Sequence, residues 1–120
     1  MPTYVDGFVI PVPKKRLPAY LRMAKKASKI WKEYGALDYK ECVGDDLDVK
    51  CGLPFPKGIK TKSGETVVFS YIVYKSRQQR DAVNKKIMND PRIHAMCDPN
   101  NMPFDAARMI YGGFKAVVEI

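Results

Sequence analysis

Two carboxylates stand within apolar, strand-like stretches of this sequence, Asp6 in YVDGFVIPV and Glu41 in ALDYKECV. Burial of a carboxyl group disfavours its charged form and raises its pKa. A carboxyl group with a raised pKa is suited to general acid–base catalysis near neutral pH. We therefore name Asp6 and Glu41 as candidate catalytic residues. The alternative is that each is exposed or hydrogen-bonded at a strand end or an interface.

Two further side chains complete the set of candidate catalytic residues. His94 is the only histidine of the chain, and an unperturbed imidazole titrates near physiological pH. Tyr71 places a hydroxyl group inside the apolar run ETVVFSYIVYK. The alternatives are that His94 is a surface residue and that Tyr71 belongs to the core.

Aromatic and cationic side chains are candidates for binding a ligand. Trp31, Tyr39 and Phe55 could line an apolar pocket of the kind that holds an aromatic molecule. Arg108 follows Asp105 closely in the chain, so it could hold an anion or form a structural salt bridge. The alternative for the aromatic residues is that they pack in the core.

The sequence predicts no cofactor and no metal site. Gly112 and Gly113 fall in a strand-like segment and lack the spacing of a nucleotide-binding loop. A single histidine cannot supply a histidine-based metal site. The three cysteines, Cys42, Cys51 and Cys97, are widely and irregularly spaced, which argues against a disulfide framework and fits a reducing compartment. We therefore expect a cytoplasmic protein.

The composition is that of a single globular domain spanning residues 1–120. Hydrophobic residues make up 46% of the chain, which argues against intrinsic disorder. No apolar run approaches the roughly 18 residues that a membrane span needs. The first residues also lack the pattern of a secretory signal, so we expect no membrane partner.

The formal net charge of +8 would also suit a protein that binds RNA or another anion. Much of this charge lies on one side of a predicted amphipathic helix, at Arg22, Lys25, Lys26, Lys29 and Lys32. A charged helix side of this kind is usually a solvated surface, and the chain lacks the motifs of RNA-binding modules. Nucleic acid is therefore the less favoured partner, and RNA or anion binding stays an alternative function.

Strand and helix patterns follow one another in a specific order. Period-two patterns predict strands at residues 4–12, 36–43, 65–75 and 108–120. Three- and four-residue steps predict helices at residues 15–34 and 77–89. Residues 46–64 and 92–107 show no sustained period and are expected to be loops.

The order strand, helix, strand, strand, helix, strand predicts a ferredoxin-like α+β fold. Its four-stranded antiparallel sheet carries both helices on one face, with residues 65–75 in the middle. Both sides of this strand are apolar, so the second face of the sheet must be covered as well. A second copy of the chain, packed sheet to sheet, would cover it. We expect a homodimer whose interface is well above roughly 1,000 Å².

The segments YVDGFVIPVP, ETVVFSYIVYKSRQQRDAVN and MPFDAARMIYGGF together resemble the YbaA-like family of unknown function. The resemblance covers almost the whole chain. It implies membership of the dimeric α+β barrel superfamily, which also includes cofactor-independent monooxygenases and small stress-related proteins. It implies no particular activity, because the family has no agreed one.

The resulting prediction is a homodimer that binds a small molecule in a cleft between the sheet and the helices. The two irregular segments, residues 46–64 and 92–107, would cap this cleft. Asp6 and Glu41 would lie roughly 10 Å apart across two inter-strand steps and face one cavity. If the protein is an enzyme, the resemblance to the superfamily suggests a cofactor-independent reaction of the monooxygenase-like type. The alternative is a structural or regulatory dimer without a ligand.

Overall fold

The computed structural model describes residues 2–120. Its elements follow the chain as β1 (Tyr4–Pro13), the 3₁₀ turn η1 (Lys14–Arg16), α1 (Leu17–Glu33), β2 (Asp38–Val43), α2 (Phe55–Gly58), β3 (Glu65–Tyr74), α3 (Arg77–Met88), α4 (Pro91–Met96), η2 (Ala106–Arg108) and β4 (Ile110–Lys115). The strands form one antiparallel sheet in the order β2-β3-β1-β4. The predicted ferredoxin-like α+β fold is therefore confirmed, with β1 and β3 in the middle of the sheet.

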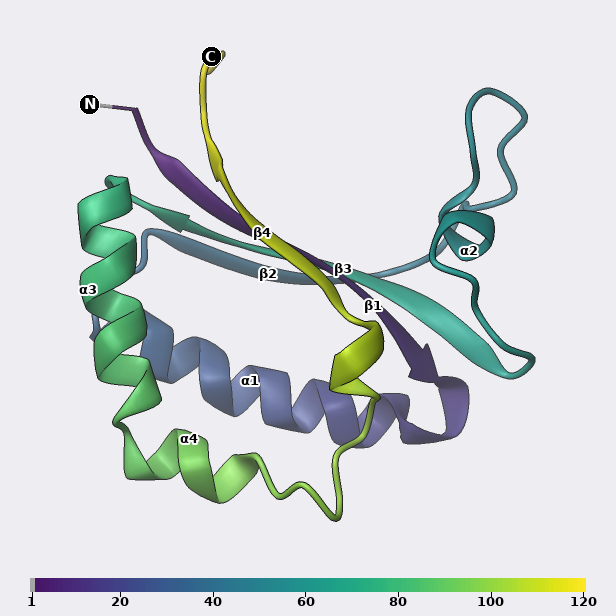
Figure 1. Cartoon of the computed structure of the whole chain (residues 1–120), viewed down its shortest axis with the longest axis horizontal. Helices are drawn as coiled ribbons and strands as arrows, with labels where there is room; N and C mark the ends of the chain where they lie inside the picture. The colour runs from purple at the N-terminus through teal and green to yellow at the C-terminus, as the bar shows by residue number, and fades with distance from the viewer. Residues whose placement is uncertain (1) are drawn as a thin grey trace.

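Helices α1, α3 and α4 lie on one face of the sheet, and α2 lies on the other side (Figure 1). The covered face carries alternate residues of the strands, because successive side chains of a strand point to opposite faces. The side chains on the covered face pack against the apolar sides of α1 and α3. The buried core consists of Ile10, Val12, Tyr20, Ala24, Ile30, Val68, Ile72, Tyr74, Val83 and Ile87.

The ends of the two long helices are set by local signals. Pro18 stands in the first turn of α1, where a missing N–H group costs little. Gly35 follows the helix with a φ of 107°, a conformation that favours glycine. At the start of α3, the Ser76 side chain accepts a hydrogen bond from the backbone N–H of Gln79, as the capping-box pattern predicts. This cap sets where α3 begins over the sheet.

The two segments expected to be loops each contain a short helix. Pro91 ends the pattern of α3 and also opens α4, since proline suits the first turn of a helix. Asp90 caps α4 by accepting a hydrogen bond from the backbone N–H of Arg92.

The last strand is shorter than expected, because β4 pairs with β1 only as far as Lys115, opposite Tyr4.

The second face of the sheet is apolar and largely uncovered. Phe69 of β3 is 44% exposed, and Ile110 and Phe114 of β4 are 56% and 62% exposed. We call the surface around these three residues the open sheet face. The C-terminal end of the chain and the segment that carries α2 rise on either side of it (Figure 1). Exposed apolar side chains of this kind are typical of interaction surfaces.

Candidate functional site

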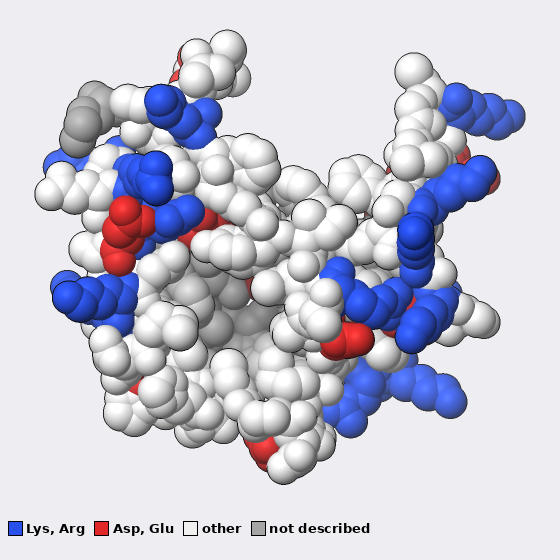
Figure 2. Space-filling model, viewed as in Figure 1, with Lys and Arg blue, Asp and Glu red and all other residues white. Residues whose placement is uncertain are grey.

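A cavity of about 160 Å³ lies between the covered face of the sheet and the helices α1 and α4. The molecule is visibly hollowed on this side (Figure 2). Most of the lining is apolar or aromatic: Phe8, Ile10, Tyr20, Met23, Ala24, Ala27, Trp31, Tyr39, Ile93, Met96, Cys97, Phe104 and Met109. Glu41 is the one carboxylate among the described residues that line it. We call this space the Glu41 cavity.

The alternation of β2 brings two polar side chains to the cavity wall. Tyr39 and Glu41 lie two residues apart and therefore share the covered face of the sheet. They are paired across the sheet with Ile72 and Ser70 of β3. Tyr20 comes from α1, which crosses this part of the sheet, so the site combines one helix with two neighbouring strands.

Both oxygens of Glu41 accept hydrogen bonds from tyrosine hydroxyl groups. Tyr20 donates to Oε1 at 2.7 Å, and Tyr39 donates to Oε2 at 2.8 Å. Burial raises the pKa of the Glu41 carboxyl, and the hydroxyl groups of Tyr20, Tyr39 and Ser70 partly offset that rise. Among residues 2–120, no lysine or arginine forms an ion pair with Glu41.

The two tyrosines remain hydrogen-bond donors over the ordinary pH range. Burial, together with the nearby Glu41 carboxylate, raises the pKa of Tyr20 and of Tyr39. Each oxygen of a carboxylate has two lone pairs, so Glu41 can accept a further bond from a molecule in the cavity. A carboxylate in this state can act as a general base and, once protonated, as a general acid.

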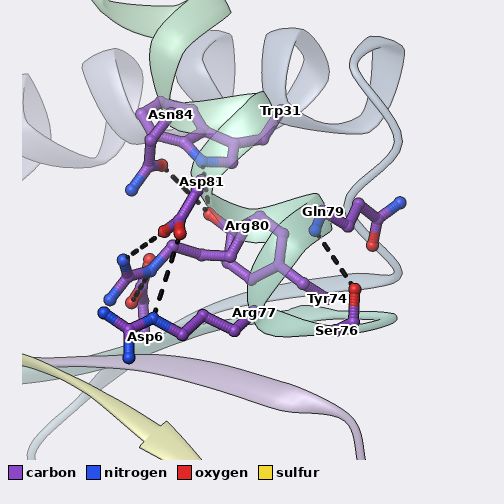
Figure 3. A network of polar contacts seen from close by, with 9 residues as sticks. All are labelled: Asp6, Trp31, Tyr74, Ser76, Arg77, Gln79, Arg80, Asp81 and Asn84. Carbon is purple, nitrogen blue, oxygen red and sulfur yellow. Dashed lines mark hydrogen bonds and ion pairs between the residues drawn. The ribbon is translucent and has the colours of Figure 1, made fainter. Parts of the chain in front are cut away.

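Trp31 is fixed at the wall of the Glu41 cavity by a buried network. Its indole N–H donates to the Tyr74 hydroxyl at 3.0 Å, and that hydroxyl donates to Asn84 Oδ1 at 3.4 Å (Figure 3). The rings of Trp31 and Tyr39 have centroids 6.0 Å apart. Trp31 is also the only tryptophan of the chain. Its fluorescence can therefore report on the contents of the cavity.

Asp6 makes no contact with Glu41 and instead pairs with Arg80 of α3 (Figure 3). Its Oδ1 lies 3.0 Å from Nε of Arg80, and the Asp6 side chain is buried. Arg80 also pairs with Asp81 at 2.7 Å and lies over the ring of Tyr4 at 4.9 Å. Asp6 does not line the Glu41 cavity, so the two carboxylates do not share one cavity as expected.

A glycine leaves room on the strand beside this ion pair. Gly113 of β4 is paired with Asp6. A Cβ atom added to Gly113 would collide with the guanidinium group of Arg80 and with the ring of Tyr4. The absence of a side chain therefore leaves the space that Arg80 uses to reach Asp6.

The other two predicted catalytic residues lie apart from Glu41. Tyr71 belongs to the opposite face of the sheet, since it alternates with Ser70 and Ile72 along β3. His94 is exposed on α4, and its ring contacts the carbonyl oxygen of Met88. Neither residue lines the Glu41 cavity, and their catalytic roles stay predictions.

Two of the four predicted ligand-binding residues line the Glu41 cavity, and two do not. Tyr39 and Trp31 line the Glu41 cavity. Phe55 lies on α2, where its ring packs edge-on against Phe69 of the open sheet face at 6.3 Å between centroids. Arg108 pairs with Glu65 at 2.6 Å instead of with an acidic neighbour in its own segment. Residues 92–107 contribute to the cavity lining, whereas residues 46–64 do not.

Tyr20 is the functional side chain that the sequence-based site lacks. Its place in the apolar stripe of α1 indicates only that it is buried. A buried tyrosine hydroxyl normally finds a hydrogen-bond partner. A polar group on the facing strand was therefore the one indication in the sequence that Tyr20 belongs to the site. Glu41 is that group.

Other features bear on which chemistry these side chains could support. Among residues 2–120, no group of three or more His, Cys, Asp or Glu side chains could hold a metal ion. Cys42, Cys51 and Cys97 are free and exposed. In the same described range, no helix is both long and apolar enough to cross a membrane.

Comparisons with known proteins relate the chain to a family and to a solved fold. A family model described as "Protein of unknown function (DUF1428)" matches residues 3–106. "Uncharacterized protein YbaA" of Escherichia coli strain K12 is 45% identical over 116 residues, which cover 97% of each chain, and the protein of that name from Shigella flexneri matches equally. A dimeric ferredoxin-like protein from an uncultured marine organism has a TM-score of 0.63 over the full length of both chains. Its identity of 11% makes this a likeness of fold alone.

Proposed function

This chain belongs to the YbaA-like family of unknown function (DUF1428), and we propose that it binds a small, mainly apolar molecule in the Glu41 cavity. The observation that carries the proposal is the state of Glu41. Its carboxylate stands at the wall of an apolar cavity, held by two tyrosine hydroxyl groups and by no ion pair within residues 2–120. Such a carboxylate costs stability, which favours a functional reason for its presence.

The size and lining of the cavity favour a ligand about as large as one aromatic ring. The cavity measures about 160 Å³, and an apolar cavity of about 150 Å³ accommodates benzene. The ligand would need a donor group, such as a hydroxyl, to bond with Glu41. Phenol is the simplest molecule with both properties.

Proton transfer is the chemistry that this arrangement supports. Glu41 would take a proton from the bound molecule or return one to it, while Tyr20 and Tyr39 hold the carboxylate in place. The cofactor-independent, monooxygenase-like reaction, which is known only from other members of the superfamily, stays a prediction. In such a reaction, Glu41 would first remove a proton from a phenol or enol of the substrate.

The first experiment is native mass spectrometry of freshly purified protein, followed by identification of any small molecule released on denaturation. Binding of phenol would then be titrated by the fluorescence of Trp31. We expect Glu41→Gln to weaken binding about tenfold, the effect of losing one hydrogen bond to a charged group. Glu119→Gln, the same change at an exposed position, is the matched control. Equal binding by the Glu41→Gln variant and the wild type would contradict the proposal.

A homodimer formed through the open sheet face is the second part of the proposal. The exposure of Phe69, Ile110 and Phe114 supports it, as does the dimeric description of the similar ferredoxin-like protein. Light scattering should give the mass of two chains. Combined Phe69→Glu and Phe114→Glu should give one chain, because two charges would be buried in the interface. Leu21→Glu, at an exposed apolar residue of α1, should leave the dimer intact.

The free cysteines support a cytoplasmic location. Cys42, Cys51 and Cys97 are exposed and unpaired with one another, and free thiols of this kind persist in a reducing compartment. Fractionation of cells that express the tagged chain would test the location. Recovery from an oxidising compartment would contradict it.

A further inference from the structure

A second hollow adjoins the Glu41 cavity on the side of α1. It measures about 230 Å³ and lies between α1 and the segment that joins α4 to η2. Arg16, Arg22 and Lys26 line it together with Asn101, and we call it the basic groove. The side chains of Met23 and Met96 line both the basic groove and the Glu41 cavity. Two methionine side chains therefore lie between the two spaces.

Within the described part of the chain, the cations of the basic groove have no acidic partners. Arg22 and Lys26 are four residues apart on α1, so they are neighbours on one side of the helix. Among residues 2–120, none of Arg16, Arg22 and Lys26 forms an ion pair. No described residue that lines the groove is acidic. The groove therefore has a positive potential that an anion would neutralise.

Arg16 has hydrogen-bonding capacity that the described residues do not use. Its Nη2 donates to the side-chain oxygen of Asn101 at 3.2 Å. Its Nε is buried and has no hydrogen-bond partner within residues 2–120. A buried donor without an acceptor is costly, and a guanidinium group binds carboxylates in a fork of parallel hydrogen bonds. An anion in the groove would let the Arg16 guanidinium group reorient and donate hydrogen bonds from both Nε and Nη2 to the anion.

We propose that the ligand of the Glu41 cavity carries a carboxylate, and that the basic groove binds this group. The inference rests on the proposed function, because the ring of the same ligand occupies the cavity. A short aliphatic chain would pass between Met23 and Met96, whose unbranched side chains adapt readily. Glu41 would repel a carboxylate, so the hydroxyl end of the ligand enters the cavity and the anionic end stays outside. The ligand class is thus a hydroxyaryl carboxylic acid.

Two probes that differ only in the carboxylate test this inference. They are para-ethylphenol and para-hydroxyphenylpropionate, titrated against the wild-type protein by Trp31 fluorescence. We expect the propionate to bind about tenfold more tightly, because charge-assisted hydrogen bonds add to the contacts of the ring. High salt should reduce this advantage.

Charge-matched variants separate a local effect from the general positive charge. Combined Arg22→Gln and Lys26→Gln should remove most of the advantage of the propionate and leave para-ethylphenol binding unchanged. Combined Lys25→Gln and Lys29→Gln removes the same charge from exposed positions of α1 outside the groove and should preserve the advantage. The thermal unfolding of both variants should match the wild type, since these side chains are exposed.

The outcomes distinguish this inference from the proposed function. Equal affinity of the wild type for both probes, or equal loss in both double variants, overturns the carboxylate site while cavity binding stands. If the wild type binds neither probe, both the carboxylate site and the proposed binding in the Glu41 cavity are overturned. Loss of propionate binding in the groove variant alone supports the site.

Discussion

Asp6 and Glu41 lie on the same face of the same sheet, yet their surroundings differ in kind. Asp6 is buried against an arginine at 3.0 Å, and that arginine has further partners in Asp81 and Tyr4. Glu41 has two tyrosine hydroxyl groups and, within residues 2–120, no ion pair. Asp6 is enclosed by protein, whereas Glu41 borders a cavity.

The difference separates a structural carboxylate from a candidate functional one. A buried charge that is paired and hydrogen-bonded links the elements that supply its partners, here β1 and α3. A partly buried carboxylate with neutral partners keeps a raised pKa and open lone pairs, which are the properties of an acid–base group. Each of the following predictions sharpens or breaks this division.

Removal of the arginine should give the largest change in stability. In Arg80→Met the Asp6 carboxylate stays buried without its cation, so we expect the free energy of unfolding to fall by about 3 kcal/mol. Urea denaturation measures it. Arg77→Met, at a neighbouring side chain that is 73% exposed, should change stability little. Equal behaviour of the two variants would mean that the Asp6 pair is no stronger than a surface pair.

Removal of one hydroxyl from the Glu41 site should have a smaller effect. Tyr39→Phe loses one hydrogen bond to a carboxylate, so the free energy of unfolding should fall by about 1.5 kcal/mol. Phenol binding should persist, because the cavity keeps its shape. Tyr71→Phe, on the open sheet face, is the control for loss of a tyrosine hydroxyl. A loss as large as that in Arg80→Met would make the Glu41 site structural.

Neutralising Glu41 itself should leave stability equal or higher. Glu41→Gln removes a charge that burial disfavours and keeps an oxygen that accepts a tyrosine hydrogen bond. We expect the melting temperature at neutral pH to rise by about 3 °C, which for a domain of this size corresponds to less than about 1 kcal/mol. Calorimetry measures the shift. A fall of several degrees would show that Glu41 stabilises the fold in the way assigned here to Asp6.

The pH dependence of stability should show the smallest effect. Burial raises the pKa of Glu41 above its value in the unfolded chain, so the folded state binds this proton more tightly. The corresponding stability is complete below the ordinary glutamate pKa and is lost as pH rises through the raised value. Urea midpoints between about pH 4 and pH 7 should therefore shift in favour of Glu41→Gln as pH increases. Parallel curves for the two proteins would contradict the raised pKa.

The order of the elements could be predicted from the sequence because it follows from local periodicity. The run of residues 65–75 is apolar on both sides, and this alone indicates a strand in the middle of the sheet. The short helix α4 could not be recognised, because Pro91 serves equally as the end of one helix and the start of the next. The early end of β4 depends on where β1 begins, because Lys115 pairs with Tyr4, and this is information from another part of the chain.

The candidate site could be predicted only in part. Glu41, Tyr39 and Trp31 are found because each is a polar or aromatic side chain on a predicted buried side. The separation of Asp6 from Glu41 depends on Arg80 reaching across from α3, and no period of the sequence reveals that contact. The partnership of Tyr20 with Glu41 depends likewise on how α1 crosses the sheet.

Consecutive residues of β3 lie on opposite faces of the sheet, so the two surfaces are directly linked through its backbone. Ser70 supports the Glu41 site, and Phe69, its neighbour in the chain, belongs to the open sheet face. Coupling between two binding events is reciprocal. A ligand that strengthened association of two chains would therefore bind the associated form more tightly than the single chain. Its apparent affinity would then rise with the concentration of the protein itself.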